Sequence, residues 1–135
     1  MVGARAKTIL VIEDDLSLQA AIKAKLETEG FKVLTANGSD QAFRHLKEAP
    51  KLDVIWLDHY LFGHEDGLAV VSRLKKVGSK WRHLPILVVS NTVSPDKLKS
   101  YIDLGVQRFY TKVDYKLERI VDDIKVFLEN NPGSR

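Results

Sequence analysis

Carboxylates follow two apolar segments of the chain, and their spacing is suited to chemistry. Glu13 and Asp14 follow the apolar run of residues 8–12, and Asp58 follows the run of residues 54–57. If these runs are neighbouring strands, three carboxylates converge, and like charges that lie so close resist joint ionisation. A hard divalent cation would relieve the repulsion. The pattern therefore indicates metal-assisted phosphate chemistry.

The composition bounds the kind of molecule that holds these acids. A chain of 135 residues has the size of one domain, so we expect a single domain over 1–135 with an ordered core over about 7–129. Hydrophobic residues make up 44% and charged residues 29%, as in a soluble globular protein. The net charge of +3 comes from 21 basic and 18 acidic residues spread along the chain. That small excess does not indicate direct binding of nucleic acid.

The residue types also indicate a compartment. The sequence contains no cysteine, which excludes disulfides and thiolate metal sites and fits a reducing cytosol. No stretch of the chain approaches the roughly 20 apolar residues of a membrane span. We therefore expect a cytoplasmic protein without a membrane partner.

Short apolar runs alternate with amphipathic segments along the whole chain. Near-continuous apolar runs are typical of strands that are covered on both faces, as in a parallel sheet. The segments between them have apolar residues at helical spacing. The five expected strands span residues 9–12, 31–35, 54–57, 85–89 and 106–110.

Capping residues place the ends of the expected helices. The expected starts are Asp15, Ser39 as an N-cap, Asp66 with Gly67, and Ser94 with Pro95. The expected ends are Gly30, Pro50, Gly78, Gly105 and Pro132 with Gly133.

A strand followed by a helix thus occurs five times, which predicts an α/β fold: a doubly wound, three-layer, parallel five-stranded sheet. The commonest order at this length is the flavodoxin-like 2-1-3-4-5, in which ligands bind at the carboxyl ends of strands one and three. Asp58 and the pair Glu13 and Asp14 lie at those two ends. Ser90 ends the fourth strand and Lys112 follows the fifth, so a hydroxyl and an ammonium join the carboxylates at one rim.

These motifs together resemble the receiver domain of two-component response regulators, in the single-domain form of the chemotaxis regulators. An acid pair, an aspartate, a hydroxyl and a lysine that each end the correct strand make a specific signal. The resemblance covers nearly the full length. Its motifs are ILVIEDD (residues 9–15), DVIWLD (53–58), PILVVS (85–90) and FYTK (109–112).

The resemblance implies a role for each acid. Asp58 would be the phosphoacceptor, taking a phosphoryl group from the phosphohistidine of a sensor histidine kinase or a phosphotransfer protein, and a carboxylate is a competent nucleophile for this. Glu13 and Asp14 would hold Mg²⁺, with Asp58 and the backbone carbonyl of Tyr60 as further ligands. The chain would be a signalling receiver and not an enzyme, apart from catalysing its own phosphorylation and dephosphorylation.

The resemblance also implies a switch. Ser90 would hydrogen-bond a phosphoryl oxygen and Lys112 would neutralise another. The aromatic Phe109 would turn inward behind Ser90 and change the affinity of one face for a downstream protein, by population shift. That face comprises the fourth helix, the fifth strand and the fifth helix. A receiver of this kind acts by binding a partner or by passing phosphate onward in a relay.

Three positions depart from the usual receiver pattern. Val113 replaces the proline that usually follows the lysine after a cis bond, so the turn either holds a strained cis bond or is trans and aims Lys112 differently. Phe62 stands in a longer loop where proline is frequent, and Asn91 replaces a small residue beside the hydroxyl. These departures keep open a pseudo-receiver, a binding module that phosphorylation does not control.

Two other interpretations are weaker. A phosphatase similar to the haloacid dehalogenases needs a second aspartate two residues after the nucleophile, and here that residue is Tyr60. His59 and His64 lie near the site, but they lack the paired spacing of a transition-metal motif. We expect them to be histidines of a flexible loop.

Overall fold

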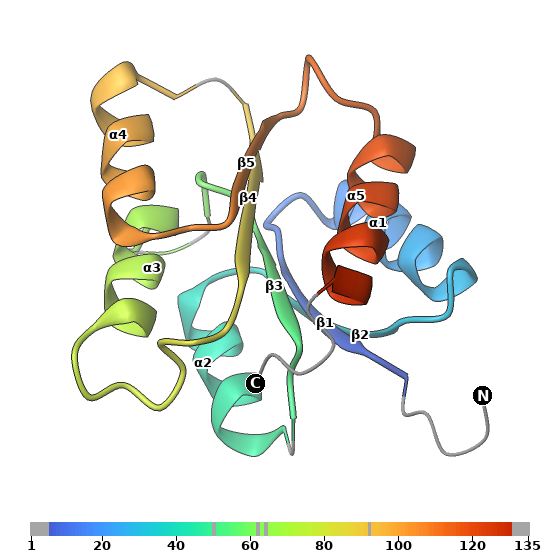
Figure 1. Cartoon of the computed structure of the whole chain (residues 1–135), viewed down its shortest axis with the longest axis horizontal. Helices are drawn as coiled ribbons and strands as arrows, with labels where there is room; N and C mark the ends of the chain where they lie inside the picture. The colour runs from blue at the N-terminus through green and yellow to red at the C-terminus, as the bar shows by residue number, and fades with distance from the viewer. Residues whose placement is uncertain (1–5, 50, 62, 64, 92, 131–135) are drawn as a thin grey trace.

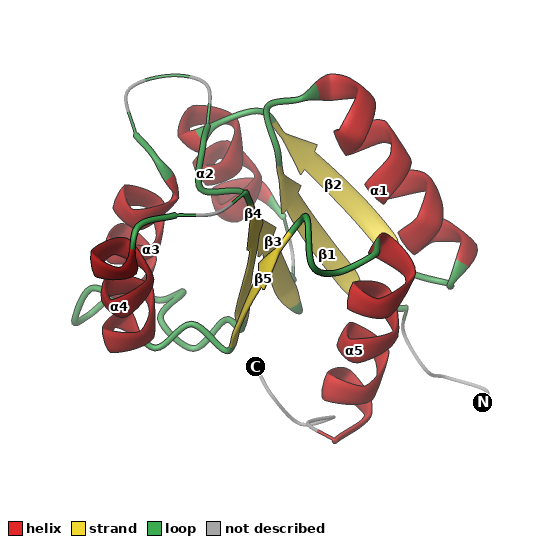
Figure 2. Ribbon diagram, turned by 90° about the horizontal axis from the view of Figure 1, so that it is seen from above, coloured by secondary structure: helices red, strands yellow, loops and turns green. Residues whose placement is uncertain are grey.

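A parallel five-stranded sheet lies at the centre of the molecule (Figures 1 and 2). The strand order is β2-β1-β3-β4-β5, which confirms the predicted fold class and order. The strands are β1 (Thr8–Ile12), β2 (Lys32–Ala36), β3 (Val54–Leu57), β4 (Ile86–Ser90) and β5 (Arg108–Thr111). The structure is a computed structural model that describes residues 6–49, 51–61, 63, 65–91 and 93–130.

Helices cover both faces of the sheet. They are α1 (Leu16–Thr28), α2 (Ser39–Glu48), α3 (Gly67–Lys75), α4 (Pro95–Leu104) and α5 (Leu117–Asn130). Figure 2 shows α1 and α5 on one face and α2, α3 and α4 on the other. Among the described residues, no helix is long and apolar enough to cross a bilayer.

The pleat of the strands divides the core into two layers. In β3, Ile55 and Leu57 pack on the side of α2, α3 and α4, whereas Val54 and Trp56 pack on the side of α1 and α5. All residues of β1, β3 and β4 are buried. Burial on both faces is the reason that these strands are continuous apolar runs in the sequence.

Side-chain caps begin three of the helices, as the sequence predicts. The carboxylate of Asp15 accepts the backbone N–H of Leu18 at the start of α1, and that of Asp66 accepts the N–H of Ala69 at the start of α3. Ser94 caps α4 in the same way. Because each cap satisfies a backbone donor that the helix leaves free, these positions are good sequence signals.

Two predicted helix boundaries are wrong. Ser39 is the first residue of α2 and not its N-cap, because the carbonyl of Gly38 already accepts the N–H of Ala42 at 3.1 Å. Helix α3 ends at Lys75, before Gly78, because the extended backbone of Lys76 leaves the helix first. Gly78 has a φ of +87° in the loop that follows. Pro50, Pro132 and Gly133 lie outside the described residues.

The end of α4 also sets the start of β5. Gly105 has a φ of +89° and ends α4, and the next residue, Val106, donates its N–H to the carbonyl of Tyr101 at 3.3 Å. That bond closes the helix and keeps Val106 out of the sheet. Strand β5 therefore begins at Arg108, two residues later than its apolar run suggests.

We predict that Gly105→Ala lowers the free energy of unfolding by roughly 1–2 kcal/mol, because a Cβ disfavours the left-handed backbone. A Cβ at this position meets nothing within 4 Å, so the loss is one of backbone conformation alone. Gly105→Asn is the matched control and should lose less, since asparagine tolerates this region better. Urea unfolding of both variants tests the point, and equal losses would contradict it.

Candidate functional site

The carboxyl ends of β1 and β3 bring the predicted acids together. The two strands pair in parallel with Ile12 beside Leu57, so Glu13 and Asp58 leave the sheet side by side. The N–H of Asp58 donates to the carbonyl of Ile12 at 2.9 Å. Carboxylate oxygens of Glu13, Asp14 and Asp58 all lie within 4.8 Å of one another. This is the spacing of ligands around a single small cation, and it is the only such group of acids or histidines among the described residues.

The three acids differ in exposure. Glu13 is 0% exposed and Asp58 is 3% exposed, whereas Asp14 is open to solvent. Burial raises the pKa of Glu13 to about 7; the nearby Asp58 adds to this rise, and a hydrogen bond from Lys112 opposes it. Two buried carboxylates and one exposed carboxylate leave a side open through which a cation and an anionic substrate can enter.

The ammonium of Lys112 lies between the two buried carboxylates. Lys112 follows β5, and its backbone N–H donates to the carbonyl of Ser90 at 2.7 Å, which ties it to the end of β4. Its Nζ donates to Glu13 Oε1 at 2.9 Å and lies 3.6 Å from Asp58 Oδ2. No described peptide bond is cis, so the bond before Val113 is trans. With a trans turn, Lys112 is still aimed at both carboxylates.

The other oxygen of Asp58 faces Ser90 and the loop after β3. The buried hydroxyl of Ser90 donates to Asp58 Oδ1 at 2.7 Å. The backbone N–H of Tyr60 lies 3.4 Å from the same oxygen, and the Tyr60 side chain is 48% exposed. Asp58 is therefore contacted by a hydroxyl on one oxygen and an ammonium on the other. The carbonyl of Tyr60 as a metal ligand stays a prediction.

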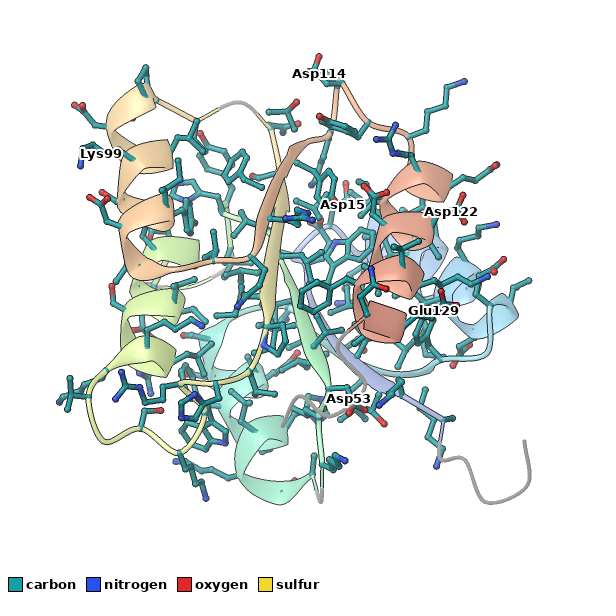
Figure 3. The ribbon with its side chains drawn as sticks, in the orientation of Figure 1. Asp15, Asp53, Lys99, Asp114, Asp122 and Glu129 are labelled. Atoms are coloured by element: carbon teal, nitrogen blue, oxygen red, sulfur yellow. The ribbon has the colours of Figure 1, made fainter. Side chains whose placement is uncertain are left out.

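Asp53 does not belong to this group, although it lies in the same sequence motif as Asp58. It precedes β3 and accepts the backbone N–H of Thr8 at 2.8 Å. Figure 3 shows Asp53 at the amino end of the sheet, away from Asp15 at the carboxyl end. Its role is to close the end of the sheet.

Phe109 lies on β5 and is half-buried. Its ring packs 5.7 Å from the ring of Tyr101 on α4, measured between ring centroids, on the side of the sheet that α3 and α4 cover. Its role as a switch stays a prediction. Asn91 is exposed beside the site. Phe62 and His64 lie outside the described residues.

The prediction of a flexible-loop histidine is wrong for His59. Its side chain is only 1% exposed, and its Nδ1 lies 2.6 Å from the hydroxyl of Tyr101. Burial lowers the pKa of His59, which favours the neutral imidazole. Gly67 is the sequence position that bears on this contact, because a Cβ there would collide with the Tyr101 hydroxyl. From the sequence alone, a glycine at the start of a helix does not show that the Tyr101 hydroxyl lies against it.

Known proteins resemble this chain in sequence and in fold. The family model described as the response regulator receiver domain matches residues 9–125. A putative NtrX-like response regulator of Rickettsia felis is 31% identical over 105 residues, which are 77% of this chain and 21% of that protein. The chain thus spans about a fifth of the length of this curated relative.

Solved structures share the fold. A CheY-like response regulator receiver domain protein from Methanospirillum hungatei superposes with a TM-score of 0.83 at 19% identity, covering 95% of this chain and 98% of that one. The phosphorylated cyanobacterial phytochrome response regulator RcpA superposes with a TM-score of 0.77 at 24% identity, covering 97% of each chain. At these identities the likeness concerns the fold alone.

We predict that Glu13→Gln stabilises the metal-free protein at high pH relative to the wild type. The pKa of Glu13 rises on folding from 4.5 to about 7. The stability that Glu13 contributes is therefore fully present below 4.5, its pKa in the unfolded chain, and is lost as the pH rises through its folded-state pKa of about 7. Glutamine carries no charge and escapes this loss, which is on the order of 3 kcal/mol.

The free energies of unfolding of both proteins are measured with urea in a chelating buffer at about pH 5 and about pH 8. The effect is the change, between these two pH values, in the difference between the two free energies of unfolding. Glu118→Gln, at an exposed position, is the control and should show no such change. A difference for Glu13→Gln that does not depend on pH would contradict the raised pKa.

Proposed function

The chain belongs to the response regulator receiver domain family, and on that premise we propose that Asp58 is the phosphoacceptor of a two-component signalling receiver. The observation that supports this most strongly is the environment of the Asp58 carboxylate. Ser90 contacts one of its oxygens at 2.7 Å and the Lys112 ammonium lies 3.6 Å from the other. A receiver domain is a signalling module and not a classical enzyme.

Receiver domains bind Mg²⁺ in an acidic pocket, and the residues here fit that ion. Every side-chain donor in the cluster is a carboxylate oxygen, the ligand type that Mg²⁺ prefers, and the exposed Asp14 leaves room for the waters that Mg²⁺ retains. In the proposal, Glu13, Asp14, Asp58 and the carbonyl of Tyr60 hold the ion. When bound, it would neutralise charge on the phosphoryl oxygens.

Apart from Asp58 as the nucleophile, catalysis of the transfer consists mostly of positioning and charge neutralisation. A carboxylate oxygen of Asp58 attacks phosphorus, the bond from phosphorus to the donor's nitrogen breaks, and the leaving imidazole keeps that electron pair. Ser90 then donates its hydroxyl to a phosphoryl oxygen in place of Asp58. Lys112 turns from Glu13 towards another phosphoryl oxygen, and charge-assisted bonds of this kind are strong.

The proposed partners are a sensor histidine kinase or a phosphotransfer protein, and a downstream protein in the cytoplasm. The downstream protein would bind the face formed by α4, β5 and α5. Ile102 on α4 offers an exposed apolar side chain there, at 62% exposure. RcpA, described as phosphorylated, shares the fold and supports the phosphoacceptor role by analogy.

We predict that Mg²⁺ changes the fluorescence of Trp56 and that acetyl phosphate changes it further only when Mg²⁺ is present. Trp56 is 1% exposed and lies two residues before Asp58. The chain has two tryptophans, so the experiment uses a Trp81→Phe background in which Trp56 is the only one. The reason for the response is that both ligands change the charge at the end of β3.

Asp58→Asn in the same background is the control, and it should lose the response to acetyl phosphate. If the Trp81→Phe protein responds to neither addition, the chain is a pseudo-receiver and the proposal is wrong. Steady turnover of phosphomonoesters would instead indicate a phosphatase.

A further inference from the structure

A chain of buried hydrogen bonds leads from Asp58 to α4. The Ser90 hydroxyl that donates to Asp58 also accepts the backbone N–H of His59 at 3.3 Å. The imidazole of His59 in turn meets the hydroxyl of Tyr101 on α4 at 2.6 Å. These contacts join the end of β3, the end of β4 and the middle of α4.

The residues of this chain are shielded from water. Ser90 and Tyr101 are 0% exposed and His59 is 1% exposed. Burial raises the pKa of the Tyr101 hydroxyl, so this hydroxyl keeps its proton and remains a donor. A buried polar group that loses its partner is costly, so His59 and Tyr101 are held to one another more firmly than an exposed pair would be.

The Tyr101 hydroxyl is closely packed by the start of α3 and by the loop after β3. The first residue of α3, Gly67, donates its N–H to the carbonyl of His59 at 2.8 Å. A Cβ on Gly67 would collide with the Tyr101 hydroxyl and would lie 2.9 Å from the Cα of His59. Because the hydroxyl is wedged between the loop after β3 and α3, a shift of His59 must either displace Tyr101 or break its hydrogen bond.

The other ring nitrogen of His59 faces the same helix. His59 Nε2 lies 3.5 Å from the ammonium of Lys97, which precedes Tyr101 by one turn of α4. It also lies 3.9 Å from the carboxylate of Asp66, the N-cap of α3. His59 therefore contacts α4 at Tyr101 and at Lys97, which are one turn apart. These two contacts hold the loop after β3 against α4.

We infer that His59 and Tyr101 are positioning residues that carry the phosphorylation of Asp58 to α4; this inference rests on the proposed function. A phosphoryl group adds anionic acceptor oxygens next to Ser90. When the Ser90 side chain rotates to bring its hydroxyl to them, its oxygen moves away from the His59 N–H, and this long bond loses its acceptor. The buried imidazole moves with its backbone, and Tyr101 moves with the imidazole.

Two neighbours of Tyr101, one in space and one in the chain, extend this motion to the proposed binding face. The Tyr101 ring packs against Phe109 of β5, so the predicted switch aromatic moves with the tyrosine. The next residue of α4, Ile102, is 62% exposed and belongs to that face. The energy available to shift α4 is limited to the difference that the phosphoryl group makes between the two arrangements.

Tyr101→Phe tests the inference because it removes the hydroxyl and keeps the ring. Tyr110→Phe is the matched control. It removes another tyrosine hydroxyl, one that donates to Asp123 at 2.8 Å on the opposite side of the sheet. Each protein is treated with Mg²⁺ and acetyl phosphate, phosphorylation is measured by intact mass, and amide hydrogen exchange is measured along α4 before and after.

All three proteins should be phosphorylated to the same extent. Phosphorylation should change exchange in α4 of the wild type and of Tyr110→Phe, and in Tyr101→Phe this change should be smaller by roughly tenfold, the effect of a single buried hydrogen bond. An undiminished response of α4 in phosphorylated Tyr101→Phe would overturn the inference. Absence of phosphorylation in the wild type would instead overturn the proposed function.

His59→Leu provides a second, independent test. If Tyr101→Phe does not fold, an undiminished α4 response in phosphorylated His59→Leu overturns the inference. His59→Leu should reduce the α4 response as Tyr101→Phe does, and the double variant should lose no more than either single variant, because both remove one connection. Losses that add in the double variant would mean that the two residues act separately and would overturn the inference.

Discussion

The structure depends on the burial of two carboxylates next to each other at the carboxyl end of a parallel sheet. Glu13 and Asp58 lie side by side because β1 and β3 are neighbours, and in the observed strand order the chain reverses its direction across the sheet at this point. Lys112 offsets part of the repulsion with an ammonium 2.9 Å from Glu13. Burial raises the pKa of Glu13 to about 7, and the nearby Asp58 adds to this rise. A bound divalent cation would favour the ionised form of both carboxylates.

The same residues serve the core and the site, and the proposed route from Asp58 to α4 depends on this. Ser90 ends a fully buried strand and contacts Asp58, and His59 fills the space between the loop after β3 and α4. A displacement of side chains at Asp58 meets packed protein on this side and not solvent, because Gly67 already lies against the Tyr101 hydroxyl. Close packing turns a small local change into a movement of an element.

Much of this could be predicted from the sequence. Continuous apolar runs identify the buried strands, and their alternation with helices predicts a doubly wound parallel sheet. The commonest order of such a sheet places Asp58 beside Glu13. The contact of His59 with Tyr101 could not be predicted in this way. The two residues are separated by 42 positions, and Tyr101 has the spacing of any core residue on α4. The start of α2 was misplaced for a similar reason, since the backbone of Gly38 makes the cap without a side-chain signal.

The central claim is that Asp58 carries the phosphoryl group, and the site of modification tests it most directly. The protein is treated with Mg²⁺ and acetyl phosphate and then with borohydride, which reduces an acyl phosphate on aspartate to homoserine. Peptide mass spectrometry locates the product. Homoserine at position 58, and its loss when Mg²⁺ is chelated, is the result that we predict. Homoserine at another aspartate, or none in a protein that retains its fold, would contradict the account.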